Sequence, residues 1–154
     1  MIQEVNGSAF LQNADIVCHQ VNCVGVMGAG IAKEAKKRMK PEDFEKYRNY
    51  CKVNDAGNLG SVFFCRATDP AGLIIANCFS QNGIGRRKVQ TNYGAMKMCF
   101  ESVKEYAKRH DMHTICVPDH IGCGLAGGDW KTVLNTILIP AFDDPDFTLL
   151  IAKL

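Results

Sequence analysis

Two glycine-rich segments are the part of this chain best suited to bind an anionic ligand. The first is Gly25-Val26-Met27-Gly28-Ala29-Gly30, and the second is Ile121-Gly122-Cys123-Gly124-Leu125-Ala126-Gly127-Gly128. Each segment follows a strand-like run and opens onto a helical pattern. Glycines let the backbone approach an anion closely, and the N–H groups at a helix start carry roughly half a positive charge. The two segments together predict a site for the diphosphate of a nucleotide-like ligand.

Two common nucleotide-binding motifs do not fit the first segment. A Rossmann G-x-G-x-x-G pattern needs a glycine where Lys33 stands, and no acidic residue ends a following strand as a ribose partner. A P-loop needs a Gly-Lys-Ser or Gly-Lys-Thr sequence, which the chain lacks. An NAD-dependent oxidoreductase therefore remains only as an alternative from another class. Asn22, at the end of the strand before the first segment, is available to hydrogen-bond a sugar hydroxyl.

His19 is the titratable residue of most interest. An imidazole transfers protons near neutral pH, so His19 is a candidate general acid or phosphate ligand. The alternative is a structural histidine that its neighbours satisfy within a strand, and the lack of a visible carboxylate partner favours that alternative. Cys123 in the second segment and Asp119 just before it are lesser candidates, because small size and turn formation explain them equally well.

Composition indicates an ordinary globular domain over residues 1–154. Apolar residues make up 47% of the chain and charged residues 22%, and no apolar run approaches the ~20 residues of a membrane span. The net charge of +2 gives no broad basic footprint, so no specific nucleic-acid partner is implied. The first residues lack the pattern of a signal peptide. We therefore expect a cytoplasmic protein with no membrane partner.

The eight cysteines are more consistent with buried free thiols than with a disulfide framework. Cys18, Cys78 and Cys116, for example, stand inside apolar runs that are typical of buried strands. No Cys-x-x-Cys pair occurs, and the nearest approach to a zinc pattern is Cys116 with His120 and Cys123. We therefore expect no metal and no cofactor.

The rest of the chain alternates strand-like and helical patterns that position the two glycine segments. Strands are expected over 14–21, 61–66, 73–79, 113–117 and 147–152. Helices are expected over 30–39, from Pro41 onward, after an N-cap at Thr91, and from an N-cap at Asp129 to a limit at Pro140. This order predicts an α/β sheet with helices on both faces, in which ligands bind beyond the carboxyl ends of the strands.

Three stretches of the sequence resemble the macrodomain family, whose fold binds ADP-ribose. They are Cys18-His19-Gln20-Val21-Asn22-Cys23, then Gly28-Ala29-Gly30-Ile31-Ala32-Lys33, and the segment from Pro118 through Gly122-Cys123-Gly124-Leu125 to Asp129-Trp130. Within the family the chain is most similar to the small stand-alone branch of Appr-1''-p processing proteins. That branch includes ADP-ribose 1''-phosphate phosphatases and de-ADP-ribosylating hydrolases. The resemblance implies a three-layer α/β/α fold with a mixed, mostly parallel sheet of about six strands.

The resemblance also implies a function. It implies binding of ADP-ribose or a derivative, with ADP-ribosylated macromolecules as further partners, and hydrolysis of a group on the distal ribose. Removal of phosphate from ADP-ribose 1''-phosphate is the preferred reaction, and a non-catalytic binding module and a de-ADP-ribosylating hydrolase are the alternatives. The catalytic candidates are His19 and Asn22. The residues placed at ligand-binding positions are Ser8, Asn22, Gly28, Ala29, Gly30, Ile31, Ser80, Gln81, Ile121, Gly122, Cys123, Gly124 and Leu125.

Three positions depart from the family pattern. Ser8 follows Gly7 where family members commonly carry an Asp that binds the adenine amino group. Gln81 and Ala126 stand where related hydrolases keep a Lys and an Asp, and Lys88 in the following loop is the alternative lysine. The sequence therefore predicts looser or backbone-based recognition of adenine and no lysine nucleophile.

Overall fold

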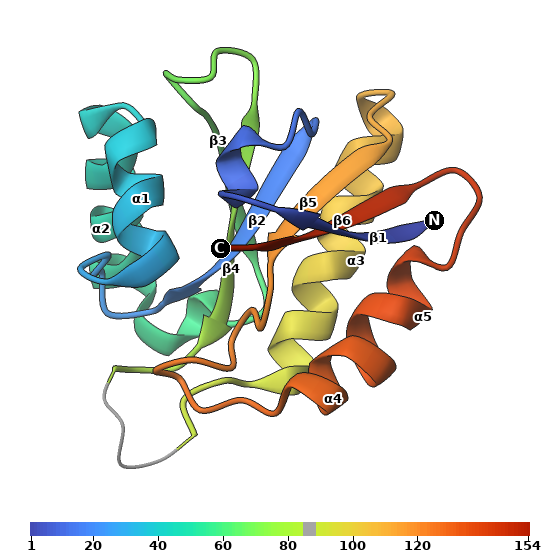
Figure 1. The fold of residues 1–154 in the computed structure, drawn as a ribbon. Helices are drawn as coiled ribbons and strands as arrows, with labels where there is room; N and C mark the ends of the chain where they lie inside the picture. Colours follow the sequence, from blue (N-terminus) through green and yellow to red (C-terminus); the bar gives the residue numbers. More distant parts are fainter. Residues whose placement is uncertain (85–88) are drawn as a thin grey trace.

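A mixed sheet of six strands runs through the middle of the molecule in the order β1-β6-β5-β2-β4-β3 (Figure 1). The structure is a computed structural model that describes residues 1–84 and 89–154, apart from the side chains of 54–56. All neighbouring strands are parallel except β3 and β4, which are antiparallel. The strands are β1 (Ile2–Asn6), β2 (Ile16–Asn22), β3 (Val62–Arg66), β4 (Ile74–Gln81), β5 (Thr114–Pro118) and β6 (Thr148–Lys153).

Helices cover both faces of this sheet, which confirms the predicted three-layer α/β/α fold (Figure 1). One face packs against α1 (Gly30–Arg38) and α2 (Pro41–Asn54), and a 3-10 turn, η2 (Asp55–Asn58), follows α2. The other face packs against α3 (Tyr93–Arg109) and the C-terminal helical segment. Successive residues of a strand point to opposite faces, so β2 sends Val17 and Val21 to the first core and Ile16 and Cys18 to the second. A strand buried on both faces reads as the continuous apolar run seen in the sequence.

The C-terminal helical segment differs from the prediction at Pro140. It begins at α4 (Trp130–Val133), where Asp129 caps the helix as predicted by accepting from Thr132 N, and passes through a π-helical stretch, η3 (Leu134–Leu138), into α5 (Ile139–Phe142). Pro140 therefore does not end the helix. Because a proline ring lacks an N–H and crowds the carbonyl one turn back, the widened π turn just before it lets the helix continue.

Two other elements also differ from the predictions. Asn92, not Thr91, caps α3 by accepting a hydrogen bond from Ala95 N. β1 was not predicted, because only Ile2 and Val5 of its five residues are shielded from solvent. It is an edge strand that pairs with β6, and the 3-10 turn η1 (Ala9–Leu11) follows it.

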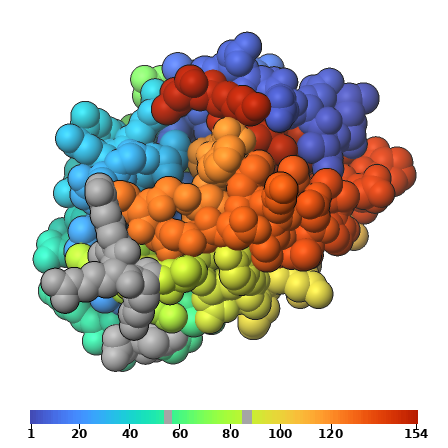
Figure 2. All heavy atoms as spheres, turned by 60° about the horizontal axis from the view of Figure 1, so that its bottom comes forward, coloured from blue at the N-terminus to red at the C-terminus, as the bar shows by residue number. Residues whose placement is uncertain are grey.

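The carboxyl ends of the parallel strands meet at one edge of the sheet, where both glycine segments emerge. The first glycine segment connects β2 to α1, and the second follows β5. Figure 2 shows the second segment (orange) beside α1 (cyan) on this side of the molecule. The edge is therefore the place where a ligand could contact both segments, as expected for open α/β sheets.

Candidate functional site

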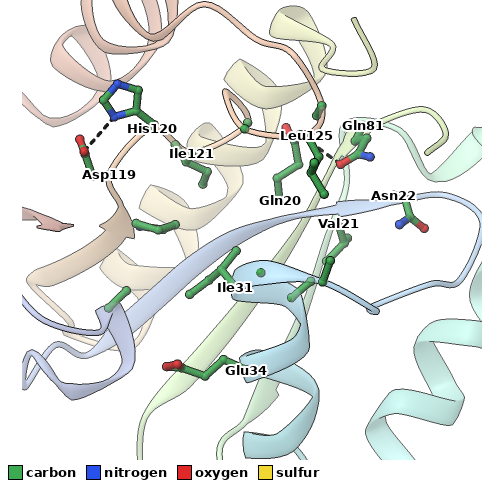
Figure 3. Close-up of a pocket in the computed structure, with 18 of the residues that line it drawn as sticks. Gln20, Val21, Asn22, Ile31, Glu34, Gln81, Asp119, His120, Ile121 and Leu125 are labelled. Carbon is green, nitrogen blue, oxygen red and sulfur yellow. Dashed lines mark hydrogen bonds and ion pairs between the residues drawn. The ribbon is translucent and has the colours of Figure 1, made fainter. Parts of the chain in front are cut away.

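A cavity of about 730 Å³ lies at this edge, between the two glycine segments (Figure 3). Its volume lies within the usual range of about 300–1,000 Å³ for small-molecule sites. The structure brings most of the predicted site residues to its wall, namely Ser8, Asn22, Gly28, Ala29, Gly30, Ile31, Gln81, Ile121, Gly122, Gly124 and Leu125. Ser80 and Cys123 do not line the cavity. Gln20 and Glu34 do, although the sequence reasoning did not select them.

The first glycine segment is held in place by Asn22. Asn22 Oδ1 accepts hydrogen bonds from the N–H groups of Val24 at 3.1 Å and Val26 at 3.2 Å, and Nδ2 donates to Val26 O at 2.7 Å. The hydroxyl of Tyr47, a buried residue of α2, donates to Asn22 O at 2.8 Å and lies 3.0 Å from Oδ1. Burial raises the pKa of Tyr47, so the hydroxyl keeps its proton and acts as a donor. Asn22 is thus a positioning residue for this segment.

The second glycine segment is held from behind by Thr91. The Thr91 hydroxyl donates to Gly122 O at 2.6 Å and accepts from Gln20 Nε2 at 3.0 Å. The buried Ser80 hydroxyl donates to Gln20 Oε1 at 2.8 Å, which explains why Ser80 supports the site without lining it. Gly122 has a φ of +75°, and a Cβ there would lie 3.0 Å from Gln20 Oε1. Polar groups of β2, β4 and the start of α3 therefore fix the shape of this segment.

Three features of the cavity wall suit an anion. Gly28 and Gly124 line the cavity, and a Cβ at Gly124 would meet nothing within 4 Å, so the glycine there is not required by packing. Among the described residues no side chain caps the N terminus of α1, which leaves the first-turn N–H groups near Gly30 without an intrahelical partner. The nearby side chains of Gln20, Asn22 and Gln81 are neutral amides. A negatively charged group beside the glycine segments would meet backbone N–H donors and neutral amides.

His19 points to the face of the sheet that α1 and α2 cover, as Val17 and Val21 of the same strand do. Its side chain is fully buried, and Nε2 lies 2.6 Å from Asn77 Oδ1, while Nδ1 has no hydrogen-bond partner among the described residues. Burial lowers the pKa of His19 to about 4, so the imidazole is neutral near pH 7. His19 is not among the described residues that line the cavity. The structure therefore does not bring this catalytic candidate to the cavity wall.

Cys123 turns away from the cavity as well. Its thiol lies 3.4 Å from Ile121 O, and burial raises its pKa to about 11. A thiol with that pKa holds its proton at neutral pH and is a poor nucleophile. Cys123 thus fits the reading in which its small size, and not its chemistry, explains its place in the segment.

The charged residues of the wall lie away from the amides (Figure 3). Glu34 extends from α1, and its Oε1 accepts a hydrogen bond from the Ser8 hydroxyl. Asp119 Oδ2 lies 2.8 Å from His120 Nδ1, and the His120 ring stacks on Trp130 with centroids 5.0 Å apart. The spacing of Glu34 from Gly30, one helical turn, is the signal that could have identified Glu34 from the sequence.

Residues 1–84 and 89–154 hold neither a cluster of metal ligands nor a membrane-spanning helix. No three His, Cys, Asp or Glu side chains in this part of the chain gather as ligands of a metal ion. None of its helices combines the length and the apolar character needed to cross a membrane.

Most of the chain matches a known protein family. The family model for the Macro domain matches residues 18–137, which include most of β2, both glycine segments and the start of the C-terminal helical segment. The chain belongs to the Macro domain family. The predicted resemblance to macrodomains is therefore confirmed.

Relatives of this macrodomain include enzymes that act on ADP-ribose derivatives. It is 33% identical over 86 residues to an ADP-ribose 1''-phosphate phosphatase of Meyerozyma guilliermondii, a match that covers 49% of each protein. It is 38% identical over 63 residues to a DNA ADP-ribosyl glycohydrolase of Mycobacterium tuberculosis, covering 41% of this chain and 17% of the relative. The solved DarG macrodomain of M. tuberculosis has a TM-score of 0.80 and 25% identity, covering 99% of this chain and 97% of that chain.

The three positions that depart from the family pattern, Ser8, Gln81 and Ala126, all line the cavity of this macrodomain. Gln81 Nε2 donates to Gly83 O at 2.6 Å, and Gln81 Oε1 accepts from Gln20 at 3.2 Å. Ala126 O accepts the N–H of Gln90 at 2.8 Å, which ties the second glycine segment to the chain before α3. The alternative lysine, Lys88, falls outside the described residues, as do Arg86 and Arg87. The absence of a lysine nucleophile therefore stays a prediction.

Proposed function

We propose that this macrodomain binds ADP-ribose, or a derivative of it, with the diphosphate between Gly28–Ile31 and Gly122–Leu125. The observation that carries the proposal is a single cavity onto which two glycine segments and the uncapped start of α1 all open. Backbone N–H groups and the partial positive charge of a helix start stabilise phosphate oxygens there. A diphosphate followed by a second ribose would occupy both segments, whereas a monophosphate would reach fewer donors.

We further propose hydrolysis of a group carried on the distal ribose, with ADP-ribose 1''-phosphate as the preferred substrate. Support comes from the relatives, one of which is named an ADP-ribose 1''-phosphate phosphatase and another a DNA ADP-ribosyl glycohydrolase. Both names describe removal of a substituent from ADP-ribose. ADP-ribosylated macromolecules are the partners that the second name suggests for this chain.

A non-catalytic binding module is the second candidate function. It is favoured by the neutral amides of Gln20, Asn22 and Gln81 beside the glycine segments, because amides neither donate nor accept protons as acids and bases do. The burial of His19 away from the cavity favours the same reading. Binding of ADP-ribose is common to both candidates, and only turnover separates them.

The test is a phosphate-release assay with ADP-ribose 1''-phosphate, run beside calorimetry with ADP-ribose on the same preparation. The phosphatase proposal predicts binding and multiple-turnover release that a Gly124→Glu variant loses, because the new carboxylate opposes the diphosphate. The binding module would be favoured if the protein binds ADP-ribose but releases neither phosphate from ADP-ribose 1''-phosphate nor ADP-ribose from an ADP-ribosylated oligonucleotide. No binding by the folded protein would contradict both.

We also propose that residues 1–154 act as a single macrodomain in a reducing cytoplasm. Buried free thiols support this location, since reducing compartments keep such cysteines unoxidised. The buried free thiols are Cys18, Cys51, Cys65, Cys78, Cys99 and Cys116.

A further inference from the structure

Positive charge is concentrated on the two helices that cover one face of the sheet (Figure 1). Residues 30–54, which span α1 and α2, contain eight Lys and Arg residues against four Asp and Glu residues. The rest of the chain contains ten against twelve. The net charge of +2 for the whole chain therefore conceals an excess of four positive charges on these two helices.

Most of this positive charge is not neutralised by ion pairs. Three ion pairs within the helices, formed by Arg38, Lys46 and Arg48, use three of the four carboxylates. Lysines in a last turn stabilise a helix C terminus, but its partial charge is only about half an elementary charge, and α1 has three cations there. Five exposed lysines form no ion pair among the described residues: Lys33, Lys36, Lys37, Lys40 and Lys52.

A groove of about 550 Å³ lies between the end of α1 and the first turns of α2, and we call it the α1–α2 groove. Lys36, Lys37 and Arg48 line it. Lys36 Nζ lies 4.3 Å from the centroid of the Phe44 ring, a cation–π contact that holds this lysine in the groove. Glu45 is the one carboxylate among the described residues of the wall, and it pairs with Arg48 at 3.2 Å. The groove therefore offers an excess of cations, one of which is positioned by an aromatic ring.

The α1–α2 groove is separate from the ligand cavity but adjoins the first glycine segment. No described residue of the groove lines the cavity. A Cβ at Gly25 would lie 3.7 Å from Arg48 Cα, so Arg48 packs against the back of the first glycine segment. On α1, Lys36 and Lys37 follow Gly30 by about 9–10 Å along the helix axis. The basic surface therefore begins beside the cavity and extends away from it.

We propose that the α1–α2 groove binds the phosphate backbone of a single-stranded nucleic acid. Unpaired lysines and an arginine along a groove are the charge complement of a strand that carries one phosphate on each nucleotide. Contacts of this kind go to phosphates, so they hold the strand without reading its sequence. Because the groove lies outside the cavity, the proposal does not depend on the binding of ADP-ribose.

A protein partner fits this surface less well. Lysine is depleted at the apolar core of protein interfaces, whereas interfaces with nucleic acid are much more positively charged. In the groove Met39 is buried and Phe44 is half-buried. None of the large exposed apolar side chains of the described residues lines it. The groove therefore lacks the apolar area that a protein interface buries, and its charge favours a nucleic acid.

Fluorescence anisotropy with a labelled single-stranded DNA oligonucleotide of mixed sequence tests the proposal on the whole chain. The logarithm of the association constant should fall with the logarithm of the salt concentration, with a slope of about −0.7 for each phosphate contact. Three cations line the groove, so we expect a slope of about −2 for the parent protein. Millimolar ADP-ribose should leave this binding unchanged, because the groove and the cavity share no described residue.

Lys36→Gln combined with Lys37→Gln removes two of the three cations. It should weaken oligonucleotide binding at least 5-fold at about 0.1 M salt and make the slope less negative by about 1.4. The matched control is Lys97→Gln with Lys108→Gln, two exposed lysines of α3 on the opposite face of the sheet. Salt screens that face from the groove, so the control should stay within about 2-fold of the parent. Lys36→Arg with Lys37→Arg keeps both charges and should keep the affinity.

Thermal melting shows whether each variant is folded, and three results would overturn the proposal. The first is a folded parent protein that leaves the anisotropy unchanged at low salt. The second is equal weakening by the groove variant and the control variant. The third is displacement of the oligonucleotide by ADP-ribose, which would place the strand in the cavity.

Two further results separate this proposal from its neighbours. A polyglutamate peptide of equal charge that competes as well as unlabelled oligonucleotide would assign the groove to acidic proteins and overturn the choice of nucleic acid. Retained oligonucleotide binding in a protein that gives no heat with ADP-ribose would overturn the proposed function and leave the assignment of the α1–α2 groove standing.

Discussion

The two glycine segments contribute to one cavity, yet the protein holds them in opposite ways. The first is held by a single side chain, Asn22, whose amide forms hydrogen bonds with the backbone of Val24 and Val26. The second is packed against its own supports, because a Cβ on Gly128 would lie 2.5 Å from Gly122 O. The two positions therefore need glycine for different reasons. At Gly128 a side chain would collide with the backbone, whereas at Gly124 there is room for a side chain, which would project toward the cavity. Variants of these positions separate stability from ligand binding.

The largest effect on stability is expected for Gly128→Ala. The added methyl would overlap a backbone carbonyl that cannot rotate away, and it would strain the bond from Gly128 N to Gly122 O. We expect the free energy of unfolding, measured in urea, to fall by about 3 kcal/mol. Gly124→Ala, which adds the same methyl in open space, is the control and should change it by less than about 0.5 kcal/mol. Equal stability of the two variants would mean that the second segment is not packed as described.

Tyr47→Phe should have the next largest effect, now on the first segment. The change removes the hydroxyl that bonds Asn22 and leaves buried acceptors without their donor. We expect the free energy of unfolding to fall by about 1–2 kcal/mol. The affinity for ADP-ribose should also fall, because Asn22 would hold the first segment less firmly. Tyr106→Phe is the control, since the Tyr106 ring stacks on Phe64 and its hydroxyl makes no hydrogen bond among the described residues. A Tyr47→Phe variant as stable as the control would show that the hydroxyl does not support Asn22.

Thr91→Val tests the support of the second segment with a smaller effect. Valine keeps the shape but loses the hydroxyl that links Gln20 to Gly122 O. We expect a loss of about 1 kcal/mol in the free energy of unfolding and a several-fold loss in affinity for ADP-ribose. Thr91→Ser retains the hydroxyl and should keep the parental affinity. If the serine and valine variants bind alike, the hydroxyl does not position the segment.

Gly124→Glu should change stability least and binding most. Its side chain starts in open space at the cavity wall, so the melting temperature should stay close to that of the parent. The carboxylate then occupies the place of the diphosphate and repels it, so calorimetry should detect no ADP-ribose binding. Parental affinity in this variant would show that the second segment does not contact the diphosphate.

Much of the fold could be predicted from the sequence because its signals are local. Apolar runs gave five strands, and the order of elements gave helices on both faces of the sheet. β1 was missed because an edge strand with three exposed residues lacks a clear apolar pattern. The continuation of the last helix past Pro140 was missed because the π turn that accommodates it depends on packing that the sequence does not display.

Many residues of the cavity wall could be predicted from the sequence, but the side-chain contacts that hold the wall in place could not. A glycine segment is recognisable from consecutive residues of the sequence. By contrast, Tyr47 contacts Asn22 across 25 positions of sequence, and Glu34 contacts Ser8 across 26. Nothing in the sequence pairs these residues, because each contact arises when α1 and α2 fold onto the sheet. His19 was of interest as an imidazole in a strand, but the fold buries its side chain completely and it does not line the cavity.

Titration calorimetry with ADP-ribose and AMP on the parent protein tests the central claim most directly. We expect ADP-ribose to bind at least 10-fold more tightly than AMP, because only ADP-ribose places a diphosphate and a second ribose between the two glycine segments. At about 100 times its dissociation constant ADP-ribose should stabilise the fold by about 2.7 kcal/mol, which a thermal shift will register. Folded protein that gives no heat and no thermal shift with millimolar ADP-ribose would contradict the account.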